Sequence, residues 1–113
     1  LSGEHISYVL RYVFNKSPLA IGFNCIKPST FLLLLQLNEI LDILKVSNWG
    51  FHLNCGSGNI TDKNIGCSIE PVEYKNFIRN AAEFFPSYVG ACCGSTPLHI
   101  KMIRRFFYEK DNY

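Results

Sequence analysis

The chain has 113 residues, of which 48% are hydrophobic and 18% are charged. This composition is typical of a globular protein with one hydrophobic core, and the length suits one domain or part of a larger one. The net charge of +2 is too small to indicate nucleic acid or a membrane surface as a partner. Because the first residue is Leu1 rather than methionine, a fragment of a longer protein is one interpretation.

The cysteine count bears on the compartment. No signal peptide is recognisable, and the longest apolar run, FLLLLQLNEILDIL from Phe31, is interrupted by amide and carboxylate side chains, so we interpret it as a buried helix rather than a membrane span. An odd number of cysteines without a secretory signal predicts a cytoplasmic protein with no disulfide framework. The five are Cys25, Cys55, Cys67, Cys92 and Cys93.

The first part of the chain predicts a helix, a strand and a second helix. Ser2 can cap a helix whose apolar residues recur at helical spacing over residues 6–13. The short apolar run LAIGFNC, which ends at Cys25, is typical of a buried parallel strand. Pro28 then opens a second helix over roughly residues 30–46.

The middle of the chain predicts a second strand, a loop and a third helix. The strand is NWGFHLN at 48–54, and the glycine- and asparagine-rich segment 55–68 is the loop. Pro71 begins the helix and Pro86 ends it. The apolar stripe of this helix consists of Tyr74, Ile78, Ala81, Ala82 and Phe85.

The last part predicts a third strand and a fourth helix. The strand is SYVGA at 87–91, followed at once by Cys92 and Cys93. Thr96 caps the helix and Pro97 fits its first turn, where a missing N–H costs nothing. Its apolar face consists of Ile100, Ile103 and Phe107.

One helix followed by three strand–helix units predicts an α/β fold with a parallel sheet. Three strand–helix units cannot close a TIM barrel, which takes about 250 residues. We therefore interpret the chain as the C-terminal portion of a TIM barrel. Residues 1–113 then form one partial domain. Such a piece exposes a sheet edge and part of the barrel interior. We therefore expect it to need its missing half, a rearrangement, or self-association through the open edge.

The cysteines at the predicted strand ends point to a metal. Chemistry gathers at the C-terminal ends of parallel strands, where Cys25 and the pair Cys92–Cys93 fall, whereas Cys67 lies in a loop and is assigned no role. Adjacent Cα atoms are about 3.8 Å apart, below the usual disulfide range of roughly 4.4 to 6.8 Å, so we expect no bond between Cys92 and Cys93. Two thiolates on one zinc lie about 3.8 Å apart, and Gly94 allows the necessary turn.

Three thiolate ligands with an open fourth position are typical of catalytic zinc. Such a zinc binds a substrate thiol as a thiolate that stays nucleophilic, which predicts alkyl transfer to sulfur. Two alternatives stay open from spacing alone. The cysteines can be small buried residues with a chance pair, or the chain can be a thiol redox protein, although neither CxxC nor an evident resolving cysteine lies near the pair.

Three segments resemble the late motifs of the homocysteine S-methyltransferase family: IGFNC (21–25), HLNCG (52–56) and GACCGSTPLHI (90–100). The family includes betaine–homocysteine methyltransferase, the S-methylmethionine-dependent enzymes and cobalamin-dependent methionine synthase. The resemblance spans nearly the whole chain. It implies the homocysteine-binding domain, a (β/α)8 barrel of which these motifs form the sixth, seventh and eighth strand ends.

The resemblance also implies a site and a reaction. Cys25, Cys92 and Cys93 match the cysteines that bind Zn2+ in the family. The implied activity is methyl transfer to the sulfur of homocysteine, giving methionine. The implied methyl donor is S-methylmethionine, S-adenosylmethionine or betaine.

The chain departs from the family pattern in four respects. Ala91 replaces a glycine before the cysteine pair, Leu53 replaces a proline, and Cys55 takes the position of a small residue. The first five strand ends, which in the family supply groups for the ends of homocysteine and for the donor, have no counterpart here. The alternative function is therefore a truncated, non-catalytic homologue that binds zinc or homocysteine, or a gene-model fragment.

Five further residues near the predicted strand ends have two interpretations each. The amide oxygen of Asn54 can bind substrate or the fourth zinc position, or it can simply form a turn. His99 can support the cysteine loop by a hydrogen bond, or it can pack or cap the last helix. His52 lies in its predicted strand and is a weaker candidate for a functional residue. Asn24 can hold the loop or contact substrate. The thiol of Cys55 is a weaker candidate for an extra or replacement metal ligand.

Overall fold

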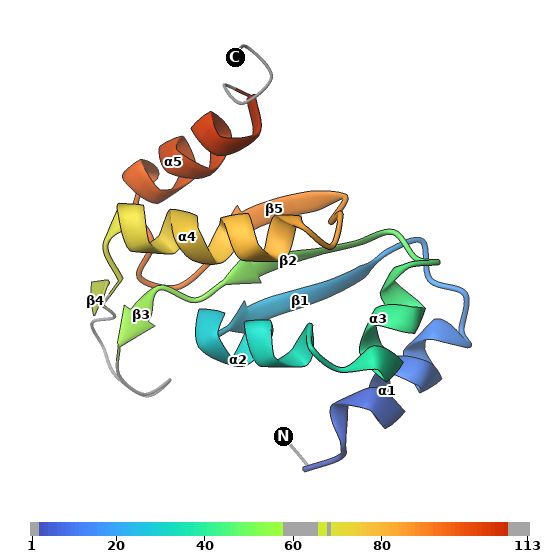
Figure 1. Ribbon diagram of the computed structural model, residues 1–113. Helices are drawn as coiled ribbons and strands as arrows, with labels where there is room; N and C mark the ends of the chain where they lie inside the picture. The colour runs from blue at the N-terminus through green and yellow to red at the C-terminus, as the bar shows by residue number, and fades with distance from the viewer. Residues whose placement is uncertain (1–2, 58–65, 68, 109–113) are drawn as a thin grey trace.

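The computed structural model describes residues 3–57, 66, 67 and 69–108, without the side chains of residues 57, 66 and 67. The predicted cap Ser2 lies outside these residues, and the first helix begins after His5. Figure 1 shows the elements in chain order: α1 (Ile6–Phe14), β1 (Ile21–Ile26), α2 (Pro28–Leu34), α3 (Asn38–Leu44), β2 (Trp49–Leu53), β3 (Gly56–Ser57), β4 (Gly66–Cys67), α4 (Pro71–Ala82), β5 (Tyr88–Ala91) and α5 (Pro97–Tyr108).

Three strands form one parallel sheet in the order β1-β2-β5. This confirms the three predicted strands and their parallel arrangement. The middle strand β2 is the most deeply buried, because it has a neighbour on each side and packs against helices. Among the described residues the sheet is open, with β1 and β5 as its outer strands. The fold is therefore an open α/β sheet, consistent with part of a barrel.

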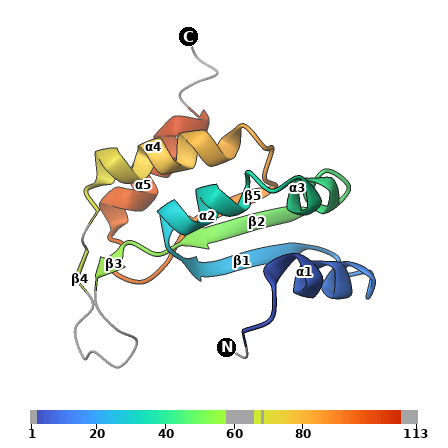
Figure 2. The ribbon, with the colours of Figure 1, turned by 60° about the horizontal axis from the view of Figure 1, so that its bottom comes forward.

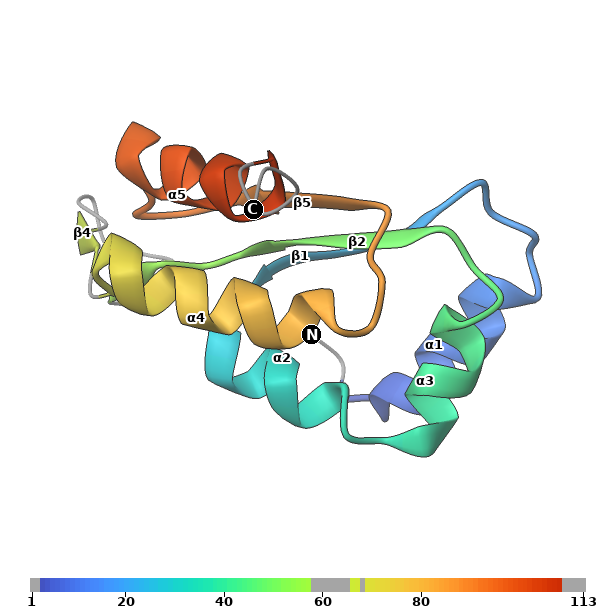
Figure 3. The same ribbon diagram turned by 45° about the horizontal axis from the view of Figure 1, so that its top comes forward.

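One face of the sheet packs against helices and forms the core. Figures 2 and 3 both show α2 and α4 on the same side of β1 and β2. Aromatic rings fill the space between these layers, with Phe31 of α2 only 4.8 Å from Phe51 and 6.2 Å from Trp49 between centroids. These three side chains are at most 1% exposed. Burying each contributes about 1.5 to 3 kcal/mol, so this face stabilises the sheet.

The opposite face of the sheet carries small and polar residues. Successive strand residues point to opposite faces, so Gly22 and Asn24 in β1 lie on the side away from the core. Both are exposed, whereas Ile21 and Phe23 between them are buried. We call this side the open face; it also carries Gly50, His52, Tyr88 and Gly90. It is the face that the sequence predicts as a barrel interior.

The sequence predicts one continuous helix over residues 30–46, and this prediction is wrong, because the structure has two helices there. α2 ends at Leu34, α3 begins at Asn38, and Leu37 between them has extended backbone angles of φ −87° and ψ 116°. α2 packs against α4, whereas α3 packs against α1. One straight helix cannot follow both directions, so tertiary packing overrides the uninterrupted helical pattern.

Helix α4 ends earlier than its apolar stripe predicts. Tyr74, Ile78 and Ala81 are buried, as predicted. Phe85 lies beyond the end of the helix, with a φ of 59° and 87% of its side chain exposed. This left-handed residue turns the chain toward Pro86 and β5, so Phe85 leaves the stripe.

The last helix, α5, begins at Pro97 directly after Thr96, as predicted. Of its predicted apolar face, Ile103 is buried but Ile100 is 49% exposed.

None of the described helices combines the length and the apolar character needed to cross a membrane.

The loop predicted after the second strand contains a short ribbon. Gly56–Ser57 (β3) pairs antiparallel with Gly66–Cys67 (β4). Residues 58–65 and 68 of the predicted loop lie outside the described residues. The ribbon lies directly after β2, at the end of the sheet that carries the cysteines.

Candidate metal centre

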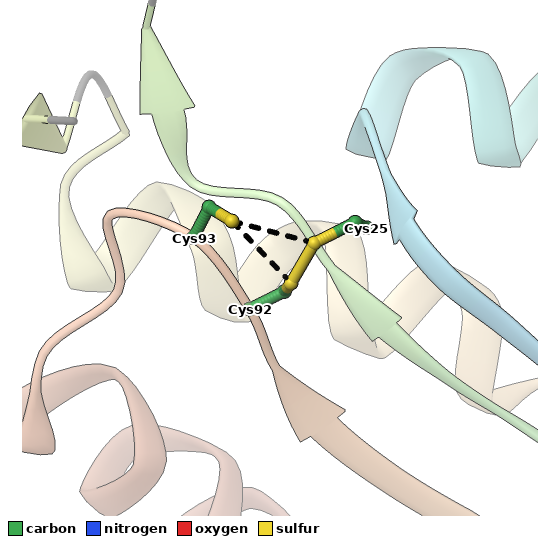
Figure 4. A group of neighbouring side chains, drawn as sticks. All are labelled: Cys25, Cys92 and Cys93. Carbon is green, nitrogen blue, oxygen red and sulfur yellow. Dashed lines mark hydrogen bonds between the residues drawn. A yellow bond between two sulfur atoms is a disulfide. The ribbon is translucent and has the colours of Figure 1, made fainter. Parts of the chain in front are cut away.

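Three cysteine sulfurs meet at the C-terminal end of the sheet. Figure 4 shows Cys25 from β1 and Cys92 and Cys93 from the segment after β5, with their sulfurs directed toward one another. All three sulfurs lie within 4.8 Å of one another. The Cys93 sulfur is 3.4 Å from that of Cys25 and 3.7 Å from that of Cys92. The structure therefore brings together the three cysteines that the sequence analysis selects as metal ligands.

A β-bulge directs Cys25 to this point. Asn24 pairs with His52 and Ile26 pairs with Leu53, so Cys25 is the extra residue on β1. Its φ of 55° lies in the left-handed region, which costs about 1 to 3 kcal/mol in a residue with a side chain. Bulges often re-aim a side chain next to a functional site. Here the bulge leaves both Asn24 and Cys25 exposed on the side away from the core.

The end of β2 holds the cysteine pair. The N–H of Cys92 donates to the carbonyl of Leu53, and the N–H of Cys55 donates to the carbonyl of Cys93, each at 3.0 Å. Gly94 then adopts a φ of 79°, which glycine tolerates at little cost. The N–H and hydroxyl of Ser95 both donate to the carbonyl of Cys92. The chain thus turns sharply directly after the two thiols.

The expectation of no disulfide is wrong at Cys25 and Cys92. The structure joins Cys25 and Cys92 by a disulfide, with their Cα atoms 5.6 Å apart. The reason is that the bulge and the end of β5 bring these two sulfurs together across the end of β2. Cys92 and Cys93 are not bonded to each other, as predicted, and Cys93 keeps a free thiol.

The same three residues fit a zinc ion when they are reduced. Two thiolates on one tetrahedral zinc lie about 3.8 Å apart, close to the separations of Cys93 from its two neighbours. Thiolate ligands select soft or borderline metals such as zinc over magnesium or calcium. Three protein ligands leave one position for a substrate atom. The donor set therefore matches a zinc centre with an open position.

His99 joins three segments beneath the cysteine loop and is only 2% exposed. The N–H of Thr96 donates to its Nδ1 at 3.0 Å, so the ring hydrogen is on Nε2, which donates to the carbonyl of Ile69 at 2.9 Å. The Cys55 sulfur lies 3.2 Å from Nε2. Thr96 precedes α5 and His99 is the third residue of the helix, so the imidazole accepts the N–H of Thr96 as the third-residue side chain of a capping box does. The structure favours the capping interpretation of His99.

Tyr74 links the two strands that lead into the site. Its hydroxyl donates to the carbonyl of Leu53 at 2.8 Å and lies 3.5 Å from that of Gly90. Burial raises the pKa of this phenol well above its ordinary value, with a smaller opposing effect from the hydrogen bond to Leu53, so the group stays a neutral donor. The ring also meets His99 edge-on at 5.2 Å. The apolar stripe of the sequence predicts only a core position for Tyr74, although a buried tyrosine usually has a partner for its hydroxyl.

The sequence model of the homocysteine S-methyltransferase family matches residues 1–107. The chain belongs to this family. The match includes the whole open sheet and all three cysteines of the cluster. A search of curated proteins finds no significant match. The homocysteine S-methyltransferase family is a methyltransferase family, which gives the general reaction class.

Other residues near the family's cysteine motifs have structural contacts. The Asn54 side-chain oxygen accepts a hydrogen bond of 2.7 Å from the N–H of Gly56, which favours the turn-forming interpretation for that oxygen. The sulfur of Cys55 is buried and faces His99 and the carbonyl of Ile69. The side chain of Cys67 lies outside the described residues. Substrate binding by Asn54 stays a prediction.

His52 lies on the open face of the sheet, in the strand where the sequence predicts it. It pairs with Asn24 on one side and Gly90 on the other, so it stands on the middle strand between the two strands that lead to the cysteines. Its side chain is half-buried. Asn24 is exposed beside the bulge.

Proposed function

We propose that this chain takes part in zinc-dependent transfer of a methyl group to the thiol of homocysteine, giving methionine. Family membership supports the reaction class. The observation that carries the metal is the convergence of Cys25, Cys92 and Cys93 within 4.8 Å at the end of a parallel sheet. That end is where parallel α/β proteins place their chemistry.

The chain's own residues supply the geometry of this reaction. The reduced thiolates of Cys25, Cys92 and Cys93 would hold the ion, which when bound lets a substrate thiol bind as a thiolate near neutral pH. The bulge at Cys25 and the turn at Gly94 fix two sides of the cluster. Cys25 is exposed, so a substrate can approach from the open face.

The transfer itself needs little else from the protein. The homocysteine sulfur attacks the methyl carbon in line, the new S–C bond forms, and the bond from methyl to the donor atom breaks. A sulfonium donor such as S-methylmethionine or S-adenosylmethionine, or a quaternary ammonium donor such as betaine, leaves as a group that no longer carries the onium charge. The leaving group needs no proton, so the site needs no general acid.

The test is the variant Cys92→Ala in reducing buffer, with zinc measured by atomic absorption and methionine measured after addition of each donor. We expect loss of both bound zinc and methionine formation, because two thiolates hold the ion more weakly than three. Lys27→Ala, an exposed change two residues from Cys25, is the control and should keep both. Full activity of Cys92→Ala without zinc would overturn the proposal.

A homologue that binds zinc or homocysteine without turnover is the second candidate. The observation that favours it is the open face, where Gly22, Asn24 and Cys25 are exposed and only three parallel strands are present among the described residues. Bound zinc and homocysteine without methionine from any of the three donors would support this candidate. Methionine formation would exclude it.

A further inference from the structure

Two rings, those of Tyr88 and His52, lie over glycines on the open face of the sheet. Tyr88 lies over Gly50, where a Cβ atom would come within 2.5 Å of its ring. His52 lies over Gly90, where a Cβ atom would come within 2.7 Å of Nε2 and still closer to the neighbouring ring carbon. The two ring centroids are 5.7 Å apart. Glycine on β5 therefore makes room for the imidazole to rest directly on the backbone.

The strand register places His52 one layer of side chains below the cysteines. Gly90 and Cys92 are two residues apart along one chain direction, and alternation places them on the same face at a distance of about 7 Å. On the other side, His52 pairs with Asn24, which precedes Cys25. His52 is thus flanked by both strands that lead to the cysteines.

The proposed reaction has one proton to remove. A neutral thiol and a cationic methyl donor give a thioether, a leaving group that has lost its onium charge, and one proton. Among the described residues of the open face, the titratable side chains are His52, Tyr88 and the clustered cysteines. The Tyr88 hydroxyl is directed to the carbonyl of Ile21, 3.5 Å away, at the opposite end of the sheet. Imidazole is the side chain most often used for proton transfer, and His52 is the one placed near the cluster.

We propose, as a step that rests on the proposed function, that His52 accepts the proton of the homocysteine thiol when the substrate binds. The S–H bond breaks, the sulfur keeps the electron pair, and an N–H bond forms on the imidazole ring. The imidazole keeps the proton while the substrate thiolate stays bound. After methyl transfer the proton leaves to water through the open face, which restores the neutral ring. His52 therefore acts as a catalytic base for substrate capture, in addition to the metal ligands.

Calorimetric titration of homocysteine into the reduced, zinc-loaded chain tests this step. Two buffers with different ionisation enthalpies, at one pH, give the number of protons released to the buffer on binding. We expect fewer than half a proton per site for the unchanged chain, because His52 retains it, and close to one for His52→Gln. Loss of the imidazolium–thiolate hydrogen bond should also weaken binding about tenfold.

Two matched variants locate the effect. Tyr88→Phe keeps the neighbouring ring and should release as few protons as the unchanged chain. Gly90→Ala keeps the imidazole but displaces it, so its proton release should rise toward that of His52→Gln. Zinc content, measured on every variant, reports that the cluster still forms.

The outcomes separate this assignment from the proposed function. If the unchanged chain binds neither zinc nor homocysteine, the proposed function fails and this step fails with it. If it binds both, and His52→Gln releases no more protons than the unchanged chain while keeping its zinc, the assignment of His52 alone is overturned.

Discussion

The hydroxyl of Tyr74 contacts both β2 and β5 close to the cysteines. It donates to the carbonyl of Leu53, which also accepts the N–H of Cys92. The phenol is buried, and its pKa is raised by that burial, so it does not lose its proton in the ordinary pH range. One neutral hydrogen bond inside the core therefore helps to set where β2 and β5 end relative to each other.

We expect Tyr74→Phe to lower the free energy of unfolding by about 1 kcal/mol, the usual net contribution of one buried hydrogen bond. The value is not larger, because the Leu53 carbonyl keeps its bond from Cys92. Urea denaturation should show a lower midpoint with an unchanged slope. Tyr88→Phe is the matched control: its hydroxyl is 3.5 Å from a carbonyl and its side chain is 38% exposed, so we expect a change below about 0.5 kcal/mol. Equal effects of the two variants would contradict this account.

Single residues also show where sequence reasoning reaches its limit. The adjacent pair Cys92–Cys93 and the strand-end position of Cys25 are readable from the chain, because strand ends follow from apolar runs and turn residues. The bulge is not readable, because it depends on how β1 registers against β2. The disulfide between Cys25 and Cys92 depends on the same register, so the number of cysteines does not predict it.

Among the elements, α5 is the helix whose start matters most to the site. Its first turn is tied to Thr96 and Ile69 through His99. Those bonds hold the segment that follows Gly94, and so limit how far the cysteine loop can move. The loop's other end is held by β2. The two cysteines are therefore held between a capped helix and a strand end.

His99→Ala should destabilise the protein by about 2 to 3 kcal/mol, because it removes a helix cap and leaves a cavity in a buried site. His99→Gln should recover part of this loss, since glutamine at the third helical position also completes a capping box. The measurement is thermal or urea unfolding followed by circular dichroism. Leu98→Ala, at a neighbouring side chain that is 60% exposed, is the control and should cost less than about 0.5 kcal/mol. A glutamine variant no more stable than the alanine variant would argue against a capping role.

The element boundaries differ in how well the sequence predicts them. Pro71 and Pro97 mark the first turns of α4 and α5 correctly, because proline fixes the backbone of a first turn locally. The break between α2 and α3 has no such local signal. It arises because the two helices pack against different partners, and those contacts exist only in the folded chain.

At the scale of the whole molecule, the cysteine cluster joins the two outer strands of the sheet. β1 and β5 do not pair with each other, yet their ends meet through Cys25, Cys92 and Cys93 across the end of β2. The order and direction of the strands could be predicted, because strands that alternate with helices form parallel sheets. Closure into a barrel stays a prediction, since a pattern of three units specifies a sheet but not what lies beyond its edges.

The open sheet also predicts association between molecules. Among the described residues, β1 and β5 each pair with β2 alone, so each presents a row of backbone groups that can pair with another strand. The open face beside β1 is exposed at Gly22 and Asn24. Such edges act as templates for pairing with a second chain. We therefore expect the sedimentation coefficient of the protein to rise with concentration in the micromolar range.

A charge on the edge strand should weaken this association, because burying a lysine against a second sheet costs more than the pairing returns. Asn24→Lys places that charge on β1, and we expect its sedimentation coefficient to stay near the monomer value at concentrations where the unchanged chain associates. Leu19→Lys adds the same charge at a side chain that is 95% exposed and precedes β1, so it should associate like the unchanged chain. If both variants dissociate equally, net charge rather than the strand edge governs association. If the unchanged chain is monomeric throughout, the open edges do not pair.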